Sequence, residues 1–266
     1  MDAPAMPMEL LFEGRFADYL REAALGDAPC IFVHVPKTAG TSLRAELAQR
    51  LRPDMNIEVD YTDTTRLFRE KMDDAVAAFL AGPAAVVRFA SGHVMGRHVA
   101  QMRAAMPEAR FITFLRDPVE RVVSDYLHQR SPRHPGHERF RETFPRLEDY
   151  AAFRPEANKA AQHLISPAVY AARDPEECVE YMMRTYAFIG VQEMYPISFR
   201  TLIALAGEPA WPSLRENVGT GDAADREVPP ELATRIRAAN PLDAALYDAT
   251  FPRWRKIRDA LSLHLA

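Results

Sequence analysis

Three short segments of this sequence carry residue types that bind phosphate and accept protons. The first is built around Lys37 and a glycine, with three hydroxyl side chains, and it runs through Pro36, Lys37, Thr38, Ala39, Gly40, Thr41 and Ser42. The second holds Arg116 and Ser124, and the third holds His93 behind a serine and a glycine. Backbone amides, lysine and arginine bind anionic oxygens, and histidine accepts protons near neutral pH. The three segments together predict group transfer from a phosphorylated donor.

The first segment lies between a predicted strand and a predicted helix. Cys30–Val35 is a short, largely apolar run that is typical of a strand buried in a parallel sheet. The helix is predicted by leucines at four-residue spacing, namely Leu43, Leu47 and Leu51. The turn therefore precedes a helix N-terminus, which is a ready anion site. The element order matches a P-loop, but a Walker A loop has its lysine after the last glycine, whereas Lys37 precedes Gly40.

The other two segments are predicted at the ends of further strands. The strand Arg110–Leu115 ends at Arg116, and the strand Ala85–Ala90 ends shortly before His93. Because the carboxyl ends of parallel strands meet at one edge of a sheet, where ligands bind, we expect these residues to lie near the first segment.

A helix start follows Arg116. Asp117 is expected to cap this helix and Glu120 to close a capping box. Ser124 then falls on the predicted polar side, together with Arg121 and His128. A guanidinium and a hydroxyl form a fork that suits a terminal phosphate.

Strands that alternate with helices predict an α/β protein, with a P-loop-like three-layer fold and a central parallel sheet. A fourth strand is predicted at Phe188–Val191. Residues 1–28 are expected to contribute one N-terminal helix, which is amphipathic and spans Met8–Leu25. Residues 128–146, rich in Arg, His and Pro, are predicted to form a flexible basic loop. We expect residues 1–266 to form a single domain.

Composition sets broad limits on function. The 266 residues are 48% hydrophobic and carry a net charge of −4, so no overall positive charge points to nucleic acid or an anionic membrane. The two cysteines, Cys30 and Cys178, form no disulfide framework or metal cluster. Since no signal peptide and no apolar stretch of about 20 residues is evident, we expect a cytoplasmic protein without a membrane span.

The first segment and its strand, Phe32–Ser42, resemble the 5′-phosphosulfate-binding motif of sulfotransferases that use 3′-phosphoadenosine 5′-phosphosulfate (PAPS). The wording is closest to the carbohydrate branch of the heparan sulfate 2-O-sulfotransferase type and its bacterial relatives. Phe114–Tyr126 resembles the 3′-phosphate motif of the same family, and Ser91–His93 resembles the segment with its catalytic histidine. A weaker match at Asn158–Gln162 resembles a segment near the acceptor or nucleotide.

The resemblance implies a role for each segment. Lys37 would contact the phosphosulfate near its bridging oxygen, and the backbone and hydroxyls of Thr38–Ser42 would hold the 5′ end. Arg116 and Ser124 would hold the 3′-phosphate, and His93 would be the general base. PAPS would be the co-substrate and 3′,5′-ADP (PAP) the product, with no metal required. The acceptor would be a hydroxyl of a saccharide or an anionic small molecule, and the oligomeric state stays open.

Several alternatives remain at this point. His98 and His163 are alternative bases, whereas His34 is expected to be a packed residue of the first strand. A P-loop-like kinase or other phosphotransferase is a second function, and Lys37 before Gly40 argues against it. A non-catalytic nucleotide-binding module is a third. The large Golgi enzymes of the family are membrane-anchored, so their polysaccharide acceptors do not carry over.

Overall fold

A parallel sheet lies at the centre of the molecule. The computed structural model describes residues 6–63, 65–207, 209–213 and 228–266. Within these ranges five strands pair in the order β2-β3-β1-β4-β5, and all neighbours are parallel. The strands are β1 (Cys30–Val33), β2 (Asp54–Ile57), β3 (Phe89–Gly92), β4 (Arg110–Leu115) and β5 (Phe188–Val191). The predicted α/β class is confirmed.

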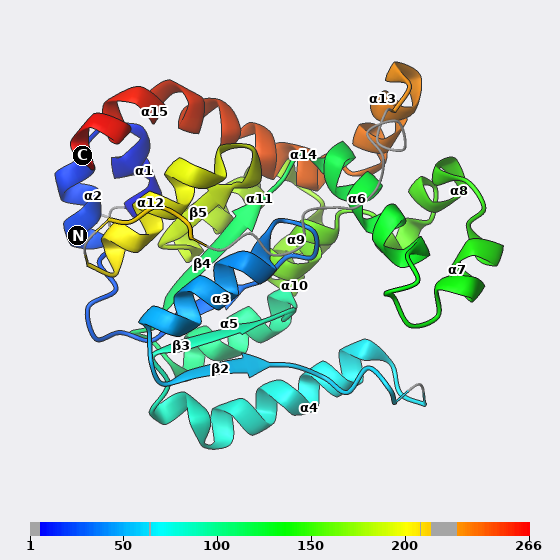
Figure 1. Cartoon of the computed structure of the whole chain (residues 1–266), viewed down its shortest axis with the longest axis horizontal. Coiled ribbons are helices and arrows are strands. Elements are labelled where there is room, and N and C mark those ends of the chain that lie inside the picture. Colours follow the sequence, from blue (N-terminus) through cyan, green and yellow to red (C-terminus); the bar gives the residue numbers. More distant parts are fainter. Residues whose placement is uncertain (1–5, 64, 208, 214–227) are drawn as a thin grey trace.

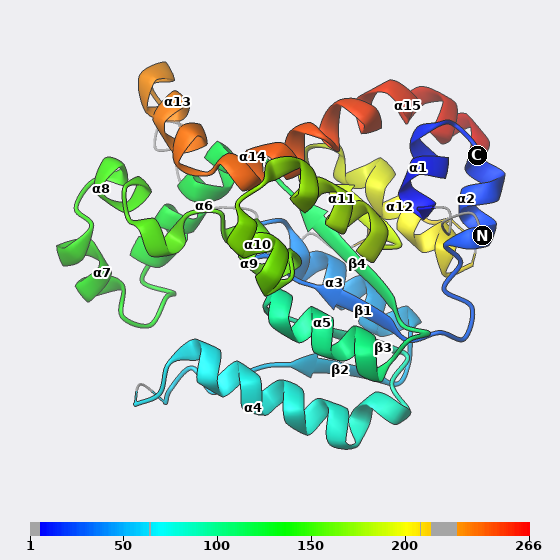
Figure 2. The ribbon, with the colours of Figure 1, turned by 180° about the vertical axis from the view of Figure 1, so that it is seen from behind.

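Helices cover both faces of the sheet and complete three layers (Figure 1; Figure 2). The first eight are α1 (Pro7–Phe12), α2 (Phe16–Glu22), α3 (Gly40–Arg50), α4 (Phe68–Ala81), α5 (Gly96–Ala105), α6 (Pro118–Arg130), α7 (His137–Thr143) and α8 (Leu147–Ala151). The others are α9 (Lys159–Leu164), α10 (Pro167–Ala172), α11 (Pro175–Thr185), α12 (Tyr195–Leu205), α13 (Pro230–Ala239), α14 (Pro241–Asp248) and α15 (Phe251–His264). Helices α3 and α12 lie over the face seen in Figure 1, and α5 and α11 over the face seen in Figure 2. None of the described helices is long and apolar enough to cross a membrane.

The register of the sheet brings the predicted segments to one edge. Val33, the last residue of β1, pairs with Gly92 on β3 and with Thr113 on β4. The residues that follow, His34 and His93, are therefore neighbours across the ends of two adjacent strands. Strands β1, β3 and β5 are buried along their whole length, which explains their nearly continuous apolar sequences.

Two strand boundaries differ from the prediction, and one strand was not predicted. The strand predicted at Ala85–Ala90 begins at Phe89, because Pro83–Ala85 forms a 3₁₀ turn and the chain only then enters the sheet. The first strand ends two residues earlier than predicted, although the backbone N–H of His34 still donates to the carbonyl of Gly92 at 3.0 Å. The edge strand β2 is largely unburied, so its sequence shows no apolar pattern.

The prediction of a single helix within residues 1–28 is wrong. The chain forms α1 and α2, separated by Glu13, Gly14 and Arg15. Gly14 has a φ of 81°, and the N–H groups of Gly14 and Arg15 donate back to the carbonyls of Leu11 and Leu10. This left-handed glycine ends α1 as glycines commonly end helices.

The flexible loop predicted at residues 128–146 is also wrong in part. Helix α6 continues to Arg130, and α7 forms within the remainder. Phe140 and Phe144, four residues apart, pack on Tyr150 with ring centroids 5.3 and 5.5 Å away. One aromatic residue within α7 and a second at its C-cap give too little periodicity to reveal the helix, which is why the segment resembled a loop in sequence.

Candidate active site

The turn between β1 and α3 holds a strained backbone. Lys37 has a φ of 72° and Ala39 a φ of 64°, although both carry side chains. Each left-handed residue of this kind costs about 1–2 kcal/mol. Such strain clusters at functional sites, and a turn with left-handed residues directs backbone N–H groups into an anion-binding concavity. The predicted segment therefore has the backbone form of an anion site.

Gly40 begins α3 because no larger residue fits there. A β-carbon on Gly40 would lie 2.1 Å from Cδ2 and Nε2 of His34. The His34 ring fills this space and contacts Phe32 and His93, with centroid distances of 5.2 and 4.3 Å. His34 is thus a packed residue, as predicted, and its ring supports the turn from below.

Helix α3 begins without a side-chain cap. Its N-cap residue is Ala39, which provides no side-chain acceptor to the first turn. The buried Thr38 hydroxyl donates instead to the carbonyl of Val35 at 2.9 Å, and so it holds the turn together. The positive end of the helix dipole, with its first N–H groups, thus adjoins the strained turn, which favours a bound anion.

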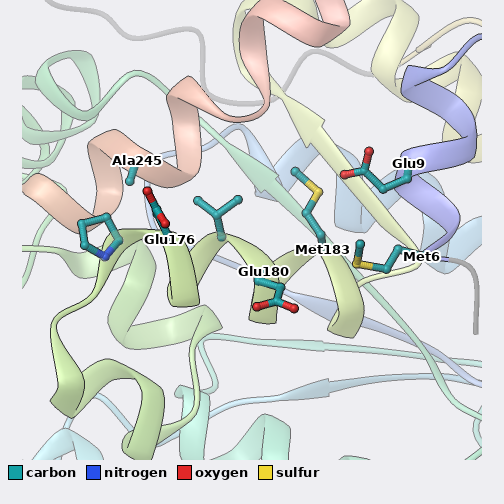
Figure 3. Close-up of a pocket in the computed structure, with 8 residues that line it drawn as sticks. Met6, Glu9, Glu176, Glu180, Met183 and Ala245 are labelled. Carbon is teal, nitrogen blue, oxygen red and sulfur yellow. The ribbon is translucent and has the colours of Figure 1, made fainter. Parts of the chain in front are cut away.

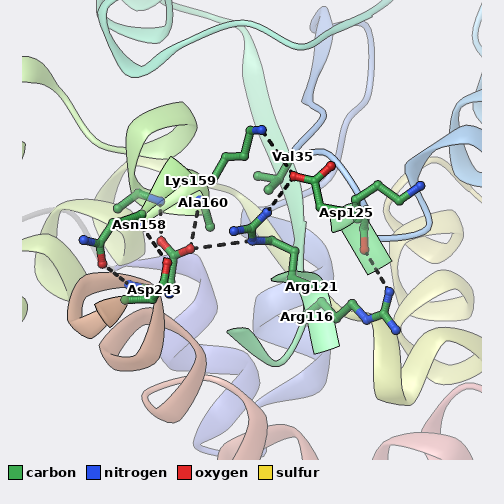
Figure 4. A network of polar contacts seen from close by, with 12 residues as sticks. Val35, Arg116, Arg121, Asp125, Asn158, Lys159, Ala160 and Asp243 are labelled. Carbon is green, nitrogen blue, oxygen red and sulfur yellow. Dashed lines mark hydrogen bonds and ion pairs between the residues drawn. The ribbon is translucent and has the colours of Figure 1, made fainter. Parts of the chain in front are cut away.

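Arg116 joins this turn to the next helix. Its Nη1 donates to the carbonyl of Lys37 at 3.3 Å (Figure 4). Its Nη2 donates to Glu120 at 3.2 Å. Because Glu120 pairs with Arg116, the predicted capping box does not form, and the N–H of Asp117 donates to Glu193 at 2.9 Å. The cap itself is confirmed, since the Asp117 carboxylate accepts from two N–H groups of α6.

The helix that carries Ser124 has a different polar side from the one predicted. Ser124 is partly buried and His128 is exposed, but the Arg121 side chain is only 2% exposed. Arg121 points into the protein because Asp125 and Asp243 compensate its charge there, at 3.5 and 3.8 Å. Arg121 therefore belongs to the protein interior, and the polar side predicted for Arg121, Ser124 and His128 is in part a buried one.

His93 follows β3 and is held in one tautomer. Its Nδ1 lies 2.7 Å from the carbonyl oxygen of His34. Because a carbonyl only accepts, Nδ1 carries the proton and Nε2 keeps its lone pair. Burial lowers the pKa of His93 below 6.5, and of the nearby charges Lys159 and Lys37 lower it further while Asp125 opposes them. His93 is therefore neutral near pH 7, as a general base must be.

The alternative bases, His98 and His163, are both buried, whereas His93 is only partly buried. His98 accepts a hydrogen bond from the N–H of Met95 at 2.9 Å through Nδ1, and its Nε2 lies 2.7 Å from Asp73, so both nitrogens are engaged. His163 is 3% exposed, its Nδ1 lies 2.7 Å from the carbonyl of Val94, and burial lowers its pKa to about 3. These contacts favour His93 among the candidate histidines.

Lys37 lies partly buried in the turn. Burial lowers its pKa, the Asp125 carboxylate raises it, and the Arg116 guanidinium lowers it. The ammonium group therefore gains from any added negative charge, and an anion bound in the turn would supply that charge.

A buried polar network beside the turn was not identified from the sequence. Its centre is Asp125, whose Oδ2 accepts from Tyr150 at 3.0 Å and lies 3.2 Å from the Lys159 ammonium and 3.5 Å from Arg121 (Figure 4). Lys159 also pairs with Glu156. Arg121 and Asp125 stand four residues apart on a helix, which was a sequence signal for one of these pairs.

The network fixes helix α9, on which Lys159 lies. The Asp243 carboxylate of α14 accepts from two N–H groups of α9, at 3.1 Å from Ala160 and 2.9 Å from Ala161. Asn158, with a φ of 53°, accepts in turn from the N–H of Leu242 at 2.8 Å. These contacts hold the start of α9 against α14 and so determine where Lys159 lies.

A separate hollow of about 360 Å³ opens between α1, α11 and α14 (Figure 3). Methionines and glutamates line much of it, including Met6, Met183, Glu176 and Glu180. None of the residues of the three predicted segments contributes to it. The candidate active site is therefore the edge of the sheet at the ends of β1, β3 and β4.

Comparisons with known proteins find likenesses among solved structures. No protein-family model and no curated protein matches the sequence. Among solved structures, the chain is similar to a sulfotransferase from Alicyclobacillus acidocaldarius, with 20% identity and a TM-score of 0.49. The match covers 85% of this chain and 98% of that chain. A likeness of this size carries no argument about activity, which depends on the site itself.

Proposed function

We propose that the chain is a PAPS-dependent sulfotransferase, with one domain, that transfers a sulfuryl group to a hydroxyl of an acceptor. The observation that carries this proposal is the strained turn at the start of α3, where Lys37 adjoins a helix whose N-cap residue gives no side-chain cap. Arg116, in contact with the carbonyl of Lys37, adds a second cation at the same edge.

The residues divide the work of binding PAPS between two ends of the nucleotide. The backbone of Lys37–Ser42 and the exposed Thr41 would hold the 5′-phosphosulfate. Arg116 and Ser124 would hold the 3′-phosphate, for which a planar guanidinium is well suited. The order of the motifs in the sequence and the left-handed backbone at Lys37 and Ala39 support this assignment.

The chemical step would be an in-line displacement at sulfur. Nε2 of His93 takes the proton as the acceptor hydroxyl attacks, and the bond between sulfur and the bridging oxygen breaks. The sulfuryl group passes to the acceptor oxygen, and PAP leaves with the bridging oxygen. Lys37 and the turn amides stabilise the charge that grows on this leaving phosphate. The acceptor would be a saccharide or an anionic small molecule, in a cytoplasmic setting.

Transfer of labelled sulfate tests this proposal. The protein is incubated with PAPS labelled in its sulfuryl group and with an extract of hydroxyl-bearing metabolites, and mass spectrometry identifies the sulfated product. We expect labelled product and stoichiometric PAP without added metal. Turnover of ATP that depends on Mg²⁺ would instead favour a phosphotransferase. Tight PAP binding without transfer to any acceptor would favour a binding module.

A further inference from the structure

The His93 ring is surrounded by charged and titratable groups from several elements. Between ring centroids, His34, which follows β1, lies 4.3 Å away, and His163 from α9 lies 6.5 Å away. Lys37 acts from the turn, Asp125 from α6 and Lys159 from α9. Since both neighbouring histidines have lowered pKa values through burial, the charges that remain near neutral pH are those of Lys37, Asp125 and Lys159.

Asp125 presents its charge to the candidate site. Tyr150, Lys159 and Arg121 all approach the same carboxylate oxygen, Oδ2. Burial lowers the pKa values of Lys37, His93, His128 and His134, and the negative charge of Asp125 opposes this effect in each case. Asp125 thus pairs with buried donors and also influences the basic groups of the site.

Lys159 lies beside Asp125 and is held there by helix α9. It stands one helical turn before His163 on α9, so the two side chains share a face of that helix. His163 adjoins the His93 ring, and Asp243 anchors the start of α9. With its ammonium 3.2 Å from Asp125, Lys159 places a positive charge next to that carboxylate and on the helix face that carries His163.

We propose that Asp125 and Lys159 are a pair of positioning residues that act on His93 through opposite charges, Asp125 favouring the protonated ring and Lys159 the neutral ring. This proposal rests on the proposed function in that it takes His93 as the base. An unopposed carboxylate would keep a buried imidazole protonated and unable to accept a proton. An unopposed ammonium would make the imidazolium costly once the acceptor proton arrives. The pair leaves the ring neutral but able to take that proton.

The experiment is a histidine titration of the free protein by NMR. The protein carries ¹⁵N-labelled histidine, and His93→Gln assigns the His93 resonance. We expect Asp125→Asn to lower the pKa of His93 and Lys159→Gln to raise it. Shifts in the same direction, or no shift in either variant, would overturn the proposal.

Controls separate charge from structure. Tyr150→Phe removes a donor from Asp125 without a change in charge, so the pKa of His93 should move less than in Asp125→Asn. Asp73→Asn removes the carboxylate beside His98, and it should shift His98 but not His93. Lys159→Arg keeps the charge and should restore the native pKa. A shift of His93 with Tyr150→Phe as large as with Asp125→Asn would overturn the proposal.

The test is independent of the donor nucleotide. If Asp125→Asn fails to fold, the pKa of His93 is compared between Lys159→Gln and Lys159→Arg. Only Lys159→Gln removes the charge, so this comparison still tests the proposal. An unchanged pKa in Lys159→Gln then overturns the proposal. The titration is carried out without PAP, so it gives the same answer if PAPS is not the donor. Failure of the proposed function would appear separately, as a lack of PAP binding and of sulfate transfer.

Discussion

Helices α3 and α6 begin at the same edge of the sheet, but only α6 has a side-chain cap at its N-terminus. Helix α3 follows a strained turn and has Ala39, without a side-chain acceptor, at its N-cap. Helix α6 has Asp117 there, and the carboxylate accepts from Val119 at 2.9 Å and Glu120 at 3.1 Å. A carboxylate at the cap satisfies the N–H groups and repels a second anion. Under the proposed function, only the first of these two helix ends would receive a phosphate through its backbone.

The difference teaches how two phosphate groups could be held at one edge. At α3 the backbone would bind, so binding depends on the shape of the turn more than on one side chain. At α6 the cap excludes backbone binding, so a phosphate there must be held by side chains, of which Arg116 is the strongest candidate. The first site is sensitive to a small steric change, and the second to loss of a charge.

The largest expected effect is a loss of turnover when His93, the proposed base, is replaced. His93→Ala should lower turnover by about 10²–10⁴-fold, because general base catalysis contributes about that much. PAP binding should remain, since the proposed phosphate contacts come from the turn at Lys37–Ser42, Arg116 and Ser124 and not from His93. In the native enzyme, kcat/KM should fall as the pH falls through the pKa of His93, which burial holds below 6.5, because the protonated ring cannot accept a proton. Native-like turnover in the variant would remove His93 from this role.

Lys37 sharpens the comparison by acting in the transition state. Charge grows on the leaving phosphate during reaction, so Lys37→Ala should lower turnover by about 10²–10³-fold, as does the loss of one oxyanion donor in other enzymes. PAP affinity should fall by a smaller factor. Single-turnover kinetics and calorimetric PAP binding measure the two effects. Equal losses in both would show that Lys37 binds the nucleotide uniformly.

Gly40→Ala tests the proposed phosphate site at the start of α3 by adding one β-carbon to the turn. The added β-carbon would overlap the His34 ring, so either the ring or the turn must move. We expect PAP affinity to fall by about 100-fold or more, because two or more charged hydrogen bonds of about 1.5–3 kcal/mol each are lost. Gly82→Ala is the matched control, since a β-carbon added there would have no neighbour within 4 Å. His34→Ala combined with Gly40→Ala should recover part of the affinity.

Asp117→Ala removes the side-chain cap at the start of α6 and should have the smallest effect. Loss of this cap should destabilise the protein by about 1 kcal/mol, with little change in PAP affinity. Thermal and urea unfolding measure the stability, and calorimetry measures the affinity. A loss of PAP affinity far larger than the loss of stability would mean that Asp117 contributes to the nucleotide site directly.

The two helix ends also show which features could be predicted from sequence. The glycine turn after an apolar strand and the Asp-Pro helix start are local signals, and both were found. The edge strand β2 was missed because little of it is buried, and α7 because two aromatic residues carry its packing. The pair of Asp125 and Lys159 joins residues 34 positions apart, and only the fold brings them together. Local chemistry could be read from the sequence, whereas long-range charge pairs could not.

The most direct test of the two-site account is the binding of PAP and 5′-AMP to the native protein and to Arg116→Ala. The native protein should prefer PAP, because only PAP carries the 3′-phosphate. Arg116→Ala should weaken PAP binding by about 10–150-fold, the equivalent of about 1.5–3 kcal/mol for a charged hydrogen bond. It should weaken 5′-AMP binding much less, so the preference for PAP shrinks. A variant that keeps the full preference for PAP over 5′-AMP would contradict the account, because Arg116 would then hold no 3′-phosphate.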